Sequence, residues 1–99
     1  MCRERNGRRI IMKMKTHELK TWPVYFDEVA DGTKKFELRR NDRDFQVGDV
    51  LDLREWNLFT ETYTGRRHKV RVTHILGGDE FPEGGLLREF VIMSLEGMT

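Results

Sequence analysis

The sequence predicts a mainly β (α+β) fold, a small barrel of about five to six strands with one capping helix after the first strand. Three observations lead to this prediction. The chain has 99 residues, the length of one domain. Short segments of alternating apolar and polar residues are separated by turn-forming residues along most of the chain. A single segment carries apolar residues at helical spacing, which gives the order β-α-β-β-β-β.

Composition bounds the possible functions. Hydrophobic residues make up 37% and charged residues 35% of the chain, which predicts a modest core under a very polar surface. The net charge of +1 does not by itself indicate a nucleic-acid-binding protein. Cys2 is the single cysteine, so we expect no disulfide and no cysteine-based metal site, as is typical of the reducing cytoplasm. Apolar runs fall far short of a transmembrane length, so we expect a cytoplasmic protein without membrane contact.

The first residues differ from the rest. Residues 1–11 are polar and basic without periodicity, and we expect them to be a flexible N-terminal extension. Residues 12–99 are expected to form the domain. The first strand is predicted over Ile10–Leu19, with Met14 and His17 on opposite faces.

One helix follows the first strand. Pro23 suits the first helical position, and Gly32 suits a left-handed residue just after the last turn. The apolar stripe that should face the core consists of Trp22, Phe26, Val29 and Ala30.

Four further strands are predicted, over Lys34–Arg40, Val50–Trp56, His68–Leu76 and Leu87–Leu95. Phe45 and Val47 are expected to enter the core between the first two of these. The apolar residues change parity between Leu53 and Trp56, which predicts a bulge. Gly65 is expected to mark the turn of the next hairpin. The last strand is apolar on both faces, so it should lie centrally in the sheet.

The candidate site centres on the stretch from Gly32 to Arg39, which reads G-x-K-x-x-E-x-R. In a strand, Phe36 and Leu38 share one face, and Glu37 and Arg39 share the other with Lys35. Glu37 can accept hydrogen bonds from the amino group of a base, and Lys34 and Arg39 can contact phosphate. The alternative is a solvated ion pair on the sheet surface, and the residues alone favour that alternative.

Aromatic residues add a second candidate feature. Trp56, Phe59 and Tyr63 lie in or near the long hairpin and are expected to be exposed, where they could stack a base. His68 and His74 lie six residues apart, and no cluster in the sequence has metal-ligand spacing, so we expect neither a metal site nor a cofactor.

The G-x-K-x-x-E-x-R stretch is followed by D-R-x-F-x-V-G-D and preceded by H-x-L-K-x-x-P-x-x-F. Together these motifs resemble the ASCH domain, a branch of the PUA-like β-barrels, and are closest to a small subfamily of bacteria and their phages without an established activity. The resemblance covers Met14 to Glu96. It implies a PUA-like barrel that binds RNA. It favours a non-enzymatic module for single-stranded RNA or a modified nucleoside or nucleotide, with a cleft lined by His17, Lys20, Lys34, Glu37, Arg39 and Arg43. The sequence does not determine the oligomeric state, and we expect a monomer.

Two other functions stay open. One branch of the superfamily hydrolyses acetylated cytidine with a lysine, a threonine and a glutamate. Lys34 matches that lysine, but Glu37 stands where the threonine would be. A small amidohydrolase of a modified pyrimidine nucleoside would therefore depend on Lys34 and Glu37 for acid–base chemistry on water. The third possibility is a protein-interaction domain whose cleft holds no ligand.

Overall fold

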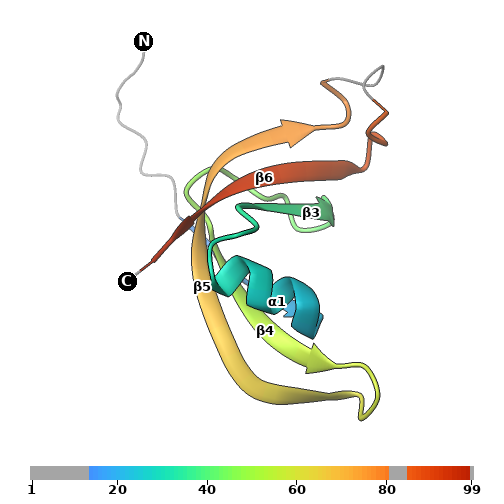
Figure 1. The fold of residues 1–99 in the computed structure, drawn as a ribbon. Coiled ribbons are helices and arrows are strands. Elements are labelled where there is room, and N and C mark those ends of the chain that lie inside the picture. The colour runs from blue at the N-terminus through green and yellow to red at the C-terminus, as the bar shows by residue number, and fades with distance from the viewer. Residues whose placement is uncertain (1–13, 81–84, 99) are drawn as a thin grey trace.

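A strongly curled five-stranded sheet wraps around one helix in the computed structural model, which describes residues 14–80 and 85–98 (Figure 1). Its elements are β2 (Thr16–Thr21), α1 (Pro23–Ala30), β3 (Phe36–Arg40), β4 (Val50–Asn57), β5 (Thr62–Gly77) and β6 (Phe90–Gly97). The predicted mainly β fold with a helix after the first strand is confirmed, although the sheet forms a half-barrel. The expected extension at residues 1–11, and the first four residues of the predicted first strand, lie outside the described residues.

The strand order is β2-β4-β5-β6-β3. β2 runs parallel to β4, and the other neighbouring strands are antiparallel. The prediction that the last strand lies inside the sheet is confirmed, because β6 pairs with β5 on one side and β3 on the other.

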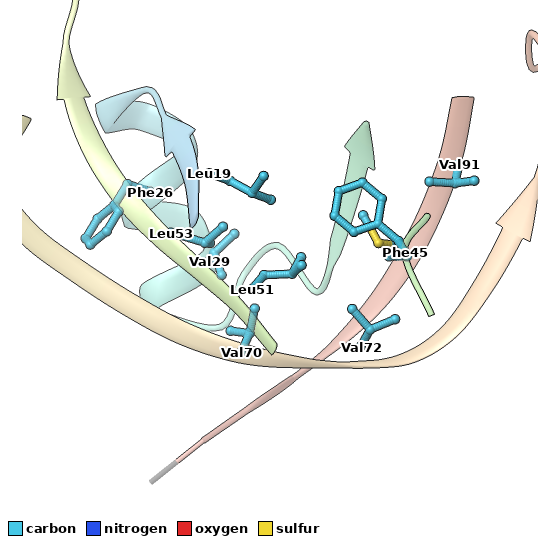
Figure 2. Close-up of a cluster of buried hydrophobic side chains, with 10 residues drawn as sticks. Leu19, Phe26, Val29, Phe45, Leu51, Leu53, Val70, Val72 and Val91 are labelled. Atoms are coloured by element: carbon cyan, nitrogen blue, oxygen red, sulfur yellow. The ribbon is translucent and has the colours of Figure 1, made fainter. Parts of the chain in front are cut away.

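The core lies on the concave face of the sheet, and α1 contributes to one part of it (Figure 2). The alternation of each strand sends every second side chain inward. Phe26 and Val29 of α1 belong to one cluster of buried side chains with residues of four strands and with Phe45. Val47 was expected in the core, but it is 58% exposed. The chain turns at Gly48, which has a φ of +97°, and Asp49 takes the buried position instead.

α1 begins and ends as its sequence predicts. Pro23 stands in the first turn, and Gly32 follows the helix with a φ of +86°, in the left-handed region. Trp22, however, was expected in the core and is 50% exposed. It precedes the first helical turn with an extended backbone, so its side chain leaves the stripe that Phe26 and Val29 form.

The β4–β5 hairpin contains the predicted bulge, which falls between Arg54 and Trp56. Gly65 does not mark the turn, because it lies within β5. The side-chain oxygen of Asn57 accepts from the backbone N–H groups of Phe59 and Thr60, and this closes the turn before β5 begins. The two arms therefore extend beyond the predicted strands.

The two edges of the sheet, β2 and β3, face each other along a line that we call the seam. Within residues 14–80 and 85–98 no backbone ladder joins them. Two arginines bridge the seam instead. Arg39 Nη2 donates to the carbonyl oxygen of Lys20, and Arg43 Nη1 donates to that of Glu18, both at 2.8 Å. Side chains thus satisfy edge carbonyls that another strand would satisfy in a closed barrel.

A buried carboxylate fixes the start of β2. Asp49 accepts from the backbone N–H groups of Lys15 and Gln46 at 3.0 Å each, and from His17 Nε2 at 2.8 Å. Burial alone would raise the pKa of the Asp49 carboxyl, but these hydrogen bonds outweigh it and lower the pKa below the ordinary value of 3.8. His17, predicted as a cleft residue, is instead buried with its ring edge-on to Phe45.

We expect Asp49→Asn to lower the free energy of unfolding at neutral pH by on the order of 1–3 kcal/mol, because an amide cannot accept all three donors. The folded-state pKa of Asp49 is depressed, so its contribution is complete above the unfolded pKa of 3.8 and is lost as the pH falls through the folded pKa.

The check is chemical denaturation of both proteins between about pH 3 and pH 7. The difference between wild type and variant should shrink toward the acid end of this range. A difference that stays constant would show that Asp49 does not contribute through its charge.

Candidate functional site

The seam opens into a pocket of about 580 Å³. Four of the six predicted cleft residues line it, namely Lys20, Lys34, Glu37 and Arg39. The lining also includes Thr21 and an apolar wall of Trp22, Tyr25, Phe36 and Leu38. β2 and the segment after it supply one side of this seam pocket, and α1, β3 and the residue Lys34 supply the rest.

The floor of the seam pocket is the carboxylate of Glu37. In the register of β3, Glu37 stands opposite Met93 of β6 and faces inward, and it is only 3% exposed. Arg39, two residues further along the same face, donates from Nε to Glu37 Oε2 at 2.6 Å. Lys34 Nζ lies 3.4 Å from Glu37 Oε1. A solvated surface ion pair, which the residues alone favoured, is therefore wrong for this carboxylate.

Lys34 is held in place by both its backbone and its surroundings. Its N–H donates to the carbonyl oxygen of Glu28 at 2.9 Å, just after the left-handed turn at Gly32. Its ammonium group lies 4.8 Å from the ring centroid of Tyr25 and 5.3 Å from that of Phe36. The cation is thus positioned over two rings as well as beside the carboxylate.

The apolar wall consists of three exposed rings and the exposed side chain of Leu38. Trp22 and Tyr25 lie with ring centroids 6.0 Å apart and planes 25° apart. Phe36 and Leu38 are about half exposed, because the inward direction of Glu37 sends both neighbours outward. Sequence reasoning missed this wall. The position of Trp22 could have indicated part of it, because a residue that precedes Pro23 lies before the helix and outside its apolar stripe.

The seam pocket lacks two of the predicted residues. The described lining does not include His17, whose Nε2 is committed to Asp49, or Arg43, whose guanidinium reaches Glu18. A second pocket of about 630 Å³ lies between the end of α1 and strands β5 and β6, and its described lining contains no Trp, Tyr or Phe.

The seam pocket combines three chemical capacities. Its rings can stack a planar apolar group, its carboxylate can accept hydrogen bonds, and its cations can contact an anion.

Among residues 14–80 and 85–98 there is no group of three or more His, Cys, Asp or Glu side chains that could hold a metal ion. No helix in the described part of the chain is long and apolar enough to cross a membrane.

Comparisons with known proteins give a family and a relative. The family described as "Domain of unknown function (DUF3850)" matches residues 16–95. A protein of Escherichia phage P2, named "Uncharacterized 12.9 kDa protein in GpA 3'region", is 33% identical over 88 residues. The match covers 89% of this chain and 79% of the phage protein. The expected relationship to phage proteins is thereby confirmed.

We expect Arg39→Ala to lower the free energy of unfolding by about 2–4 kcal/mol, because it removes the nearest cation of a buried carboxylate and a tie across the seam. Arg40→Ala is the matched control on the same strand. Its pair with Glu89 is exposed on both sides, so the loss should be about 0–1 kcal/mol. Equal losses in denaturant titrations would contradict the role assigned to Arg39.

Proposed function

The chain belongs to the family described as domain of unknown function DUF3850, and from the seam pocket we propose that it is a nucleic-acid-binding module for an unpaired or modified base of single-stranded RNA. The observation that carries the proposal is a buried carboxylate that shares one pocket with exposed aromatic rings and cations. A base presents both a flat apolar face and hydrogen-bonding edges, which are the complements of these two features.

The apolar wall supports stacking of a base. Trp22, Tyr25 and Phe36 line the seam pocket, and each is about half exposed. Stacking on an aromatic side chain suits any base, because every base has a π face. Rings that are exposed at a pocket rather than packed in the core are therefore available to a ligand.

The floor supports recognition of the edge of that base. The carboxylate of Glu37 contacts Arg39 and Lys34, and its oxygens have further lone pairs beyond these two contacts. A carboxylate accepts hydrogen bonds from an exocyclic amino group such as that of cytosine. Lys20 and Lys34 at the sides of the pocket suit the phosphates next to the bound base.

The ASCH resemblance points in the same direction. We propose that the half-barrel is of the PUA-like type, since its curled sheet and its helix after the first strand agree with the fold that the resemblance implies. The matching motif residues Lys34, Glu37 and Arg39 are also the ones that line the seam pocket.

A second candidate is hydrolysis of an acylated pyrimidine nucleoside. The contact that favours it is the 3.4 Å separation of Lys34 Nζ and Glu37 Oε1 inside the seam pocket. Such a pair could move protons to and from a water that attacks an amide carbon, which would release a carboxylic acid and the free amine. Lys34 and Glu37 would then be the catalytic residues.

The binding proposal predicts different effects for two variants in titrations of short RNA oligonucleotides over a range of salt. Lys34→Ala should weaken binding across all sequences and reduce the salt slope by about one or slightly less. Glu37→Gln keeps the shape but loses the charge, so it should change the preference among bases more than the salt slope.

Lys35→Ala is the matched control, because Lys35 is exposed, adjacent in sequence and not part of the seam pocket. Identical curves for wild type and both pocket variants, with melting temperatures confirming that all proteins are folded, would refute the proposal. Incubation with acetylated cytidine tests the second candidate. Release of acetate by wild type but not by Lys34→Ala would favour hydrolysis over binding alone.

A further inference from the structure

Lys20 belongs to the seam pocket and also to a second group of side chains. Its ammonium group lies 3.9 Å from the ring centroid of Trp56 on β4. Trp56 in turn meets Tyr63 of β5, with ring centroids 4.9 Å apart and planes at 77°. The guanidinium carbon of Arg54 lies 3.8 Å from the ring centroid of Tyr63. These four residues form a continuous row, which we call the ring row.

The strand register explains why the ring row exists. Lys20 stands opposite Arg54 across β2 and β4, and Trp56 stands opposite Tyr63 across β4 and β5. The inward positions of β2 and β4 are taken by residues such as Leu19 and Leu53, so Lys20 and Arg54 face outward. The ring row therefore crosses the outer face of three strands, beginning at the seam pocket.

From this arrangement we propose that the seam pocket and the ring row form one binding surface for a single-stranded polynucleotide. One base occupies the seam pocket, and the nucleotides next to it lie along the ring row. The inference rests on the proposed function and adds the surface on which the nucleotides next to the bound base lie.

The chemistry of the ring row fits such a chain. A polynucleotide alternates anionic phosphates with flat bases, and the ring row presents two rings in contact with a cation over each of them, the two cations being neighbours across β2 and β4. Tyr63 is 39% exposed, which leaves ring surface for stacking. Each cation is already fixed against a ring, so little freedom is lost when it meets a phosphate.

Charge also favours the pocket end of the ring row. Arg54 has an ion-pair partner in Glu18 at 3.6 Å, whereas Lys20 makes no ion pair with any of the residues that the structure describes. The cation shared by the seam pocket and the ring row is thus the one whose charge an incoming phosphate can use most directly.

The test measures the affinity of wild type for a nucleoside monophosphate and for RNA oligonucleotides of increasing length. Affinity should rise by about tenfold for each nucleotide that stacks on the ring row, and then level off. Tyr63→Leu should lower tetranucleotide affinity by about tenfold and leave mononucleotide affinity unchanged. Arg54→Gln should reduce the salt dependence of tetranucleotide binding alone.

Phe59→Leu is the matched control. Phe59 is an aromatic residue on the same hairpin, 97% exposed at its turn and outside the ring row. Its replacement should leave both affinities unchanged. Unchanged mononucleotide binding by Tyr63→Leu also shows that this variant is folded.

Each other result overturns the inference in a recognisable way. Equal affinity for a mononucleotide and a tetranucleotide would confine binding to the seam pocket, and the proposed function would survive without the ring row. Equal losses for Tyr63→Leu and Phe59→Leu would show that the ring row has no special role. Failure of wild type to bind either probe would refute the proposed function, and the inference with it.

Discussion

The buried carboxylate of Glu37 is the constraint on which the seam depends. A charge that is removed from water needs opposite charge close by, and the chain supplies it from the same strand and from the turn before it, through Arg39 and Lys34. Arg39 has donors left over after this contact, and one of them reaches the carbonyl oxygen of Lys20. The side chain of Arg39 therefore pairs with the buried carboxylate and also joins the two sheet edges.

A second buried carboxylate acts at the other end of β2. Asp49 accepts hydrogen bonds from three donors around the start of β2. Arg39 and Arg43 donate to carbonyl oxygens on the outer edge of the same strand. β2 is an edge strand that pairs only with β4 among the described strands. Its fixed position comes from these polar contacts as much as from its ladder. Because the segment after β2 carries Trp22 into the seam pocket, the same contacts also position the aromatic wall.

Local patterns in the sequence predicted the features that depend on local chemistry. The helix end at Gly32 follows from a backbone conformation that favours glycine, and the bulge follows from a change of parity. Period-two alternation tells which residues share a face but not which face is inward, so the burial of Glu37 was not predicted. The hydrogen bond between His17 and Asp49 joins residues 32 positions apart, so no local pattern in the sequence predicts it. Trp22 was misplaced because the stripe was extended one residue beyond the helix.

The arginine contacts across the seam have a consequence for how copies of this chain behave toward one another. A free strand edge offers unpaired carbonyl and N–H groups, and a neighbouring molecule can add a strand there and begin an aggregate. The carbonyls of Glu18 and Lys20 on the outer edge of β2 already accept from guanidinium groups. An approaching strand would have to displace two charged side chains and bring its own backbone against them. An open half-barrel can in this way leave a pocket accessible to a ligand while it protects its edge from self-association.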